Sequence, residues 1–198
     1  IVAVSIACVF CTAARAQDTA PSRWCAYLTN GSVQKLASDH DKQKKAPELL
    51  KALNISKVYL EFFRQTSVSN DDVKKVSGAL TQQGFEIAGG IATLPGENYG
   101  VREDAKLGWF NWQAQKTRDD VAKVMSTAAP LFSEIIVDDF FCTGDMSAES
   151  VAAKGELPWG DYRRALMVQA AQQSIIVPAK SANPTVALIM KFPQWYDR

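Results

Sequence analysis

Two adjacent carboxylates, Asp138 and Asp139, are the residues best placed to do chemistry in this 198-residue chain. They directly follow Ile135, Ile136 and Val137, an apolar run typical of a buried parallel strand. Charge at the end of such a strand costs free energy unless it has a partner or a use. Because side chains alternate between the two faces of a strand, at most one of the two carboxylates faces the mouth of the predicted fold. We expect that one to be catalytic and the other to hold a backbone amide, cap a helix or pair with a basic group; alternatively, both only organise the loop.

Polar and aromatic side chains also gather at the ends of other predicted strands. In a parallel α/β fold these ends meet at one edge of the sheet, where functional residues collect. Carboxylates supply acid, base or nucleophile in glycoside hydrolysis, and aromatic rings pack on the apolar faces of sugars. The candidate substrate-binding residues here are Glu61, Arg64, Lys191, Trp195 and Tyr196, and Asp197 is the candidate for a second catalytic carboxylate. Glu61 and Lys191 either pair across the mouth or tune the acidity of the aspartate.

A loop over residues 94–116 is too long for an ordinary connection from strand to helix, which takes about 2–6 residues. It carries Tyr99, Trp109, Phe110, Asn111 and Trp112. Exposed tryptophans beside an asparagine suit a platform on which a sugar ring stacks, so Trp109 and Trp112 are further candidates for substrate binding. The alternative is that these rings pack the loop onto the rest of the domain.

Composition excludes several classes of protein. The chain is 47% hydrophobic and 22% charged with a net charge of +1, an ordinary globular balance without the basic stripe of a nucleic-acid-binding protein. Its single histidine, His40, lies in a polar stretch and is expected at the surface. A zinc site of the usual Cys/His kind needs more ligands than this, so we expect neither a metal nor another cofactor.

Residues 1–16 have the character of part of a secretory signal peptide. They are apolar or small apart from Arg15 and end in Ala14-Arg15-Ala16, a pattern that signal peptidase cuts. The apolar stretch is too short to span a bilayer, which takes about 20 residues. We therefore expect cleavage after Ala16, a secreted or periplasmic protein, and no membrane association afterwards; the alternative is a buried N-terminal strand. In such a compartment Cys25 and Cys142 could pair.

Beyond residue 16, short apolar runs alternate with amphipathic helical patterns in one predicted domain, residues 17–198. Strands are predicted over residues 24–28, 57–63, 85–92, 134–141 and 186–190. Helices are predicted over residues 42–53, 70–83, 117–128 and 161–177, with Pro178 as a candidate break. We expect Trp24 in the core, and Gly89-Gly90 predicts a close backbone approach or a bulge.

The alternation of strand and helix predicts repeated βαβ units and a parallel sheet. A closed barrel has eight strands and takes about 250 residues, so five strands predict an incomplete, TIM-like (β/α) barrel that is the N-terminal part of a longer protein. The rival architecture is an open doubly wound sheet, which is disfavoured because no G-x-G-x-x-G follows a predicted strand.

The sequences IIVDDFFC (residues 135–142) and LIMKFPQWY (residues 188–196) together resemble the ends of the fourth and fifth strands of glycoside-hydrolase-like barrels, α-galactosidase-type enzymes among them. In several retaining families of this kind an aspartate at the end of the fourth strand is the nucleophile. The resemblance gives that role to Asp138 or Asp139. It implies an enzyme that hydrolyses oligo- or polysaccharide with retention, and an acid/base that lies beyond Arg198.

Two other functions fit parts of the same pattern. A polysaccharide deacetylase also places an Asp-Asp pair after a strand, but it needs a pair of histidines as metal ligands, and this chain has one. A non-catalytic carbohydrate-binding barrel would keep the aromatic residues and use the aspartates only as hydrogen-bond acceptors. A carboxylate at the end of the sixth or seventh strand of the complete protein would favour catalysis over binding.

Overall fold

The structure is a computed structural model that describes residues 24–138 and 140–192. Strands and helices alternate along the chain, as the sequence predicts. The strands are β1 (Trp24–Leu28), β2 (Ile55–Arg64), β3 (Thr66–Ser67), β4 (Glu86–Ala92), β5 (Glu134–Val137) and β6 (Ala187–Met190). The helices are α1 (Asn30–Ser38), α2 (His40–Ala52), α3 (Asn70–Gln82), α4 (Gln115–Ala128), α5 (Ala148–Lys154), α6 (Trp159–Ala170) and α7 (Val177–Ala182), with a short 3₁₀ turn (Ala129–Leu131) and a π-helical turn (Ala171–Ile176).

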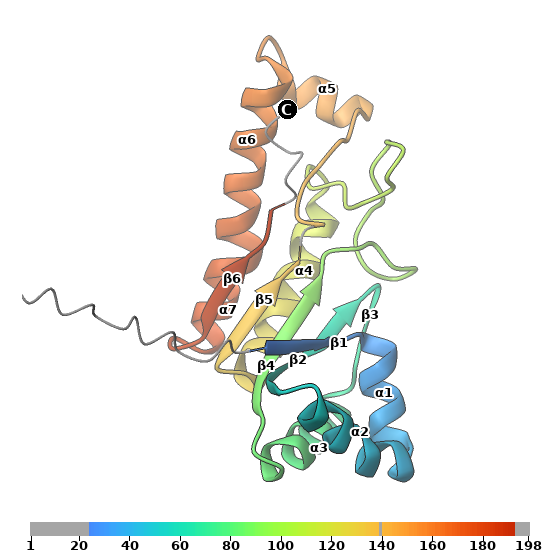
Figure 1. Cartoon of the computed structure of the whole chain (residues 1–198). Coiled ribbons are helices and arrows are strands. Elements are labelled where there is room, and N and C mark those ends of the chain that lie inside the picture. Colours follow the sequence, from blue (N-terminus) through green and yellow to red (C-terminus); the bar gives the residue numbers. More distant parts are fainter. Residues whose placement is uncertain (1–23, 139, 193–198) are drawn as a thin grey trace, which may run out of the picture.

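The strands form one sheet in the order β1-β2-β4-β5-β6, and every neighbouring pair in this series is parallel (Figure 1). The short β3 pairs antiparallel with the end of β2 and lies off this path. Each long strand therefore lies beside its predecessor in the chain, with helical segments between them, which is the βαβ arrangement. The predicted parallel α/β fold with five long strands is confirmed, and the described strands form an open sheet with β1 and β6 at its edges.

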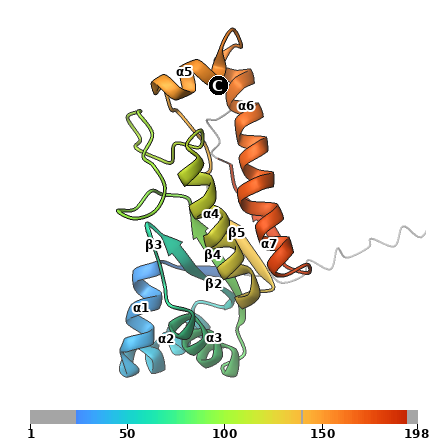
Figure 2. The ribbon, with the colours of Figure 1, turned by 180° about the vertical axis from the view of Figure 1, so that it is seen from behind.

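Helices cover one face of this sheet. Seen from behind in Figure 2, α4 and the α6–α7 rod lie in front of the strands. The strand residues on that face include Val58, Leu60, Ile91, Ile135 and Val137, all buried. They pack in one apolar core with residues from α3, α4 and α7, among them Val76, Met125 and Ala179. Continuous apolar strands are what a helix-covered parallel sheet requires.

The opposite face is more polar, and none of the described helices covers it. It carries Tyr27, Lys57, Tyr59 and Glu134, of which Tyr27 is exposed and the others are partly exposed. Trp24, at the start of the edge strand β1, is 62% exposed, so its predicted place in the core is wrong. The reason is that Trp24 lies at the first position of a strand that pairs on one side only among the described strands.

The two glycines of β4 confirm a close approach, although an aromatic ring makes it and not a backbone. A Cβ at Gly89 would lie 2.5 Å from the Phe132 ring, and one at Gly90 would lie 2.6 Å from the Tyr27 hydroxyl. The bulge lies instead in β2, where the register shifts between Glu61 and Phe63. A bulge can re-aim a side chain next to a functional site, and here it falls directly after Glu61, whose side chain is buried like those of Phe62 and Phe63.

Several elements differ from the prediction. The helices α1 and α5 were not predicted, since α1 begins Asn-Gly-Ser with only three buried apolar side chains and α5 has seven residues. The strand β5 ends at Val137 because the Asp138 carboxylate accepts the Phe140 amide hydrogen and turns the chain. The last helix continues past Pro178, since a π-helical turn precedes it and its wider turn leaves room for the ring.

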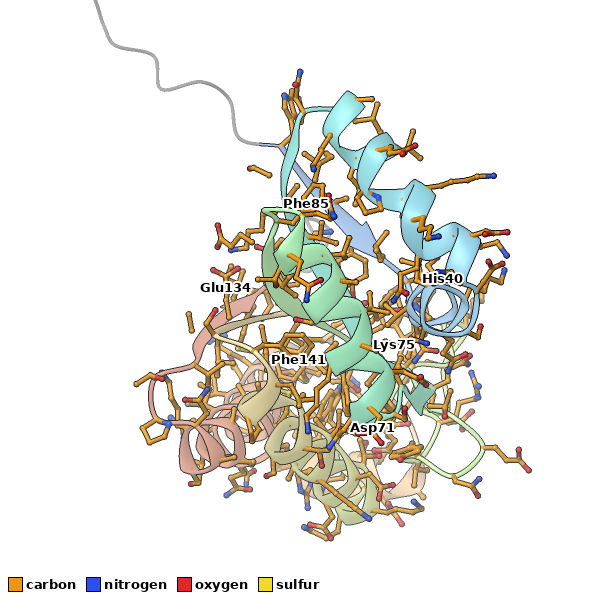
Figure 3. All side chains as sticks on the ribbon, turned by 90° about the horizontal axis from the view of Figure 1, so that it is seen from below. His40, Asp71, Lys75, Phe85, Glu134 and Phe141 are labelled. Carbon is orange, nitrogen blue, oxygen red and sulfur yellow. The ribbon has the colours of Figure 1, made fainter. Side chains whose placement is uncertain are left out.

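None of the helices within the described residues is long and apolar enough to cross a membrane. Helices α3 and α1 are joined by a hydrogen bond, in which the Lys75 ammonium of α3 donates to the Ala37 carbonyl of α1 at 2.5 Å. Figure 3 shows Lys75 on α3, with His40 at the start of α2. His40 is exposed there, as predicted.

Candidate active site

Glu61 is a completely buried carboxylate near the end of β2, and three residues hold it. The Tyr27 hydroxyl donates to Oε1 at 3.0 Å, and the Asn30 amide donates to Oε2 at 2.6 Å. Arg64 contributes Nε, at 3.0 Å from each oxygen, and Nη2, at 2.9 Å from Oε1. A buried carboxylate is tolerated when it is paired and hydrogen-bonded in this way. Because its side chain is enclosed, we assign Glu61 to holding Arg64 and not to contact with substrate.

The surroundings of Glu61 also fix the protonation of its neighbours. Burial first, and then the charges of Glu61 and Asp138, raise the pKa of the Tyr27 hydroxyl far above its ordinary value. The hydrogen bond to Glu61 raises the pKa of Arg64. Tyr27 is therefore a neutral hydrogen-bond donor and Arg64 a permanent cation.

Asp138 follows β5 and lies on the same side of the sheet edge as Arg64. Its Oδ1 accepts the backbone amides of Thr93, at the end of β4, and of Phe140, each at 3.3 Å. Its Oδ2 lies 3.9 Å from Arg64 Nη2, and its side chain is 13% exposed. The Asp138 carboxylate is thus anchored through one oxygen, while the other faces a cation at the mouth of the sheet. Both contacts, with backbone amides and with a basic group, are among those expected of the aspartate that does not face the cavity.

A second charged cluster lies at the opposite end of the strands, where they begin. Lys57 Nζ pairs with Glu134 Oε1 at 2.7 Å and with Glu86 Oε1 at 3.0 Å, and the Tyr59 hydroxyl donates to Glu134 at 2.7 Å. Burial acts to raise the pKa of Glu134, but the hydrogen bonds from Lys57 and Tyr59 outweigh it and lower the pKa. Figure 3, viewed from this end, labels Glu134. Charges at this end of a parallel β/α fold serve stability, so we assign the cluster to structure.

The loops after β4 and β5, residues 93–114 and 138–147, lie beyond the ends of these strands (Figure 1). Two buried carboxylates tie them together. Glu103 accepts the Gly144 amide at 2.8 Å, and Asp145 accepts the Asp104 amide at 2.8 Å. Asp145 also accepts the hydroxyl groups of Ser147 and Ser150. These cross-loop bonds give the wall of the site a fixed shape.

Asp145 makes the stability of these two joined loops dependent on pH. Burial acts to raise its pKa, but the hydrogen bonds from the two serines and from the Asp104 amide outweigh burial and lower it. A lowered pKa in the folded state contributes stability above the unfolded value, about 3.9, and this stability is lost as the pH falls through the folded value. We expect Asp145→Asn to lower the free energy of unfolding by roughly 1–3 kcal/mol at pH 7. The deficit should be constant above about pH 5 and should shrink below about pH 4.

Urea unfolding at a series of pH values measures this deficit. Asp161→Asn is the matched control, because Asp161 forms an exposed pair with Arg164 at 3.3 Å. Such a surface pair contributes little, so this variant should unfold like the wild type. A deficit for Asp145→Asn that stays the same down to pH 3 would contradict the assignment.

The aromatic residues of the first loop divide into two groups. Phe110 and Trp112 are fully buried, and the Trp112 indole donates to the Cys142 carbonyl at 3.2 Å. Trp112 therefore packs the loop, and its predicted role in stacking on substrate is wrong. Trp109 is half-buried, and its ring meets the Phe140 ring edge-on with 5.8 Å between the centroids. Phe140 in turn lies under the Arg64 guanidinium, 5.7 Å from its ring centre, so an aromatic wall adjoins Arg64 and Asp138.

The family model described as probable glycosyl hydrolase, catalytic domain, matches residues 12–198. The chain belongs to this family. The match confirms the resemblance to glycoside hydrolases that the two strand-end sequences suggest. In β/α barrels generally, catalytic residues are found at the carboxyl ends of the strands, which is where Asp138 lies.

Similar proteins extend the comparison. An uncharacterized protein of Saccharolobus solfataricus is 26% identical over an alignment of 193 positions, which covers 86% of this chain and 32% of that protein. The crystal structure of a hypothetical protein from Ruminiclostridium thermocellum has a TM-score of 0.55 and 14% identity, covering 83% of this chain and 96% of its own. The inactive mutant of a GH20 exo-β-N-acetylglucosaminidase from Vibrio harveyi has a TM-score of 0.53 and 12% identity, covering 85% of this chain and 34% of its own. The structural likenesses show the fold, and the chain spans about a third of the length of the curated relative.

Several predicted site residues of this chain lie outside the described residues, namely Asp139, Trp195, Tyr196 and Asp197. Lys191 follows β6 and is exposed, and its backbone amide donates to the Val137 carbonyl at 2.9 Å. The structure therefore brings Glu61, Arg64 and Asp138 together. Tyr27 and Asn30, which hold Glu61, were not predicted. The rule that strand ends carry function would have found both, since they flank the end of β1.

Within the described ranges, no three His, Cys, Asp or Glu side chains gather as ligands for a metal ion. The two cysteines of this part form no disulfide with each other; Cys25 is exposed and Cys142 is buried. The arrangement at the strand ends offers one anchored carboxylate, one fixed cation and an aromatic wall.

Proposed function

We propose that this protein is an exported glycoside hydrolase that uses carboxylates to cleave oligo- or polysaccharide. Asp138 carries the proposal, because its carboxylate stands at the end of a parallel strand with one oxygen anchored by two amides and the other facing Arg64. Such an acid is pre-organised for attack on, or charge stabilisation of, an anomeric carbon. The half-buried Trp109 and Phe140 beside it supply apolar surface for a sugar ring.

In the retaining mechanism, the nucleophile and the acid/base stand about 5 Å apart. Asp138 or Asp139 takes the first role. Among the described residues Glu61 is too enclosed to take the second, so we propose Asp197, which lies outside the described residues, for the acid/base. The proposed substrate class is an oligo- or polysaccharide.

A panel of 4-nitrophenyl glycosides tests the proposal in the full-length protein. The panel includes the β-N-acetylglucosaminide, the β-glucoside and the α-galactoside, together with polysaccharides scored by release of reducing ends. We expect release of nitrophenol or of reducing ends from at least one substrate. Absence of turnover on every one would contradict the proposed hydrolase.

A non-catalytic carbohydrate-binding barrel is the second candidate. This candidate is favoured because both carboxylates make structural contacts: Glu61 is enclosed, and Asp138 accepts two backbone amides. Calorimetric binding of oligosaccharides without any turnover would support this candidate over the first.

Export of the protein rests on residues 1–16, which lie outside the described residues. The signal-peptide pattern that ends in Ala14-Arg15-Ala16 supports it. N-terminal sequencing of the mature protein should begin at Gln17, and an intact residue 16 would contradict cleavage there.

A further inference from the structure

Arg64 has more hydrogen-bond donors than its contact with Glu61 uses. A guanidinium donates through Nε, Nη1 and Nη2. Here Nε donates to both Glu61 oxygens at 3.0 Å, and Nη2 lies 2.9 Å from Oε1. The remaining nitrogen, Nη1, carries a pair of N–H groups and makes no hydrogen bond or ion pair within the described residues. The fold therefore holds Arg64 through one side of its guanidinium and leaves Nη1 unused.

The unused nitrogen of Arg64 is open to solvent and fixed in place. The side chain is 35% exposed, and no atom of Arg64 is among the buried polar atoms that lack a partner in the described part of the chain. The Glu61 carboxylate that holds the guanidinium is itself bound by the Tyr27 hydroxyl and by the Asn30 amide. A donor that is already ordered binds a ligand without a further loss of side-chain entropy.

The charges around the guanidinium favour a neutral acceptor for Nη1. Glu61 and Asp138 both pair with Arg64, at 2.9 and 3.9 Å from Nη2, so these three side chains have a formal charge of −1. Asp139 and Lys191, which come soon after β5 and β6 in the sequence, are opposite in sign and do not change this sum. A carboxylate on the ligand would add a third negative charge beside one cation, and juxtaposed like charges disfavour binding. A hydroxyl group accepts from Nη1 without that cost.

The aromatic wall next to Arg64 favours a sugar as the source of these hydroxyls. The half-buried Phe140 has its ring centre 5.7 Å from the guanidinium carbon. A pyranose ring has apolar faces and carries its hydroxyls around the rim. A sugar that packs along the aromatic wall therefore brings its rim toward Nη1.

We propose that Nη1 of Arg64 donates to neighbouring hydroxyl groups of the substrate and makes the site selective for neutral sugars over uronates. This inference rests on the proposed hydrolase function and names the class of its substrate. Glu61 holds the donor in place, and the surplus of negative charge rejects a sugar carboxylate.

The first test compares a neutral substrate with its uronide in the full-length wild type. The probe is the 4-nitrophenyl glycoside that the enzyme turns over, and its partner carries a carboxylate at C6 in place of the hydroxymethyl group. Where only a polysaccharide is hydrolysed, the partner is the same polysaccharide oxidised at C6. We expect kcat/KM to be at least about 10-fold lower for the uronide. Equal or faster turnover of the uronide would overturn the inference.

The second test identifies the contact with monodeoxy derivatives of the neutral substrate, which lack one hydroxyl at a time. Loss of a hydroxyl that Arg64 binds should lower the wild-type kcat/KM by about 10- to 100-fold, chiefly through KM, because that hydrogen bond involves a charged donor. Arg64→Lys keeps the positive charge beside Glu61 but has no second nitrogen to present. This variant should show the same loss on the parent substrate and little further loss on those derivatives, because two changes to one contact are not additive.

Arg164→Lys is the matched control, because Arg164 is exposed and pairs with Asp161 at 3.3 Å. It should leave the kinetics of every substrate unchanged. If Arg64→Lys does not fold, the double variant Glu61→Gln with Arg64→Met takes its place, since it removes both charges of the pair and leaves no unpaired buried ion.

Losses that are fully additive between the Arg64 variant and every deoxy derivative would overturn the inference, because Arg64 would then only neutralise Glu61. That result and rapid turnover of the uronide both require an active wild type, so they leave the proposed function standing. A wild type without turnover on any substrate contradicts the proposed function itself.

Discussion

Replacing the catalytic carboxylate by its amide is expected to lower kcat by about 10⁴-fold, a loss typical of the removal of a catalytic side chain. The change is made singly, as Asp138→Asn and Asp139→Asn, in the full-length protein. We expect the loss at Asp138, whose carboxylate faces Arg64 at the sheet edge. An asparagine there is neutral and can neither attack the anomeric carbon nor stabilise positive charge on it. Its amide oxygen still accepts the Thr93 and Phe140 amides, so the fold should persist.

Asp139→Asn is the matched control for this prediction. The two positions are adjacent, so both variants remove one charge from the same turn. Circular dichroism and Tm should match the wild type in both, and calorimetric affinity for a bound oligosaccharide should change little. A loss confined to Asp139→Asn would transfer the nucleophile role to Asp139. Unchanged turnover in both variants would end the proposal that this pair supplies the nucleophile.

Much of the fold could be predicted because strand and helix patterns here are set by burial. The apolar residues before Asp138 have to be buried on the side of the sheet that the helices cover. Apolar faces of helices bury this side of the sheet, such as the face of α3 formed by Val73, Val76 and Leu80. The prediction failed for elements whose conformation is set by contacts with other parts of the chain. The short helix α1 buries few apolar groups of its own, and β5 stops early because the side chain of Asp138 turns the chain.

The site could be predicted only in part, for a related reason. Strand ends identify Glu61, Arg64 and Asp138 as members of one site, because parallel strands bring these positions together. Sequence does not show which member faces solvent. The bulge in β2 and the ring of Tyr27 over Gly90 enclose Glu61. Local sequence patterns predict neither the shift in register nor the contact of a tyrosine with a residue two strands away. Trp109 and Trp112, three positions apart, likewise have opposite environments.

Trp112→Ala is expected to lower the free energy of unfolding by about 3–5 kcal/mol, the usual cost of removing a large buried aromatic side chain. The Trp112 ring is fully buried between Phe110 and Phe141, with centroids at 5.5 and 4.9 Å. The change also leaves the buried Cys142 carbonyl without its indole donor. Thermal and urea unfolding of the full-length protein measure the loss.

Trp109→Ala is the matched variant on the same loop, and it should show the opposite behaviour. Trp109 is half-buried and touches Phe140 at the aromatic wall beside Arg64, so its removal opens a smaller cavity than that of Trp112. If the wall holds a sugar ring, this variant should lose roughly 1–3 kcal/mol of oligosaccharide affinity, by analogy with the truncation of an interface anchor, while Tm falls little. Affinity that is unchanged with a clearly lowered Tm would mean that Trp109, like Trp112, only packs the loop, and the aromatic wall would then have to be removed from the proposed site.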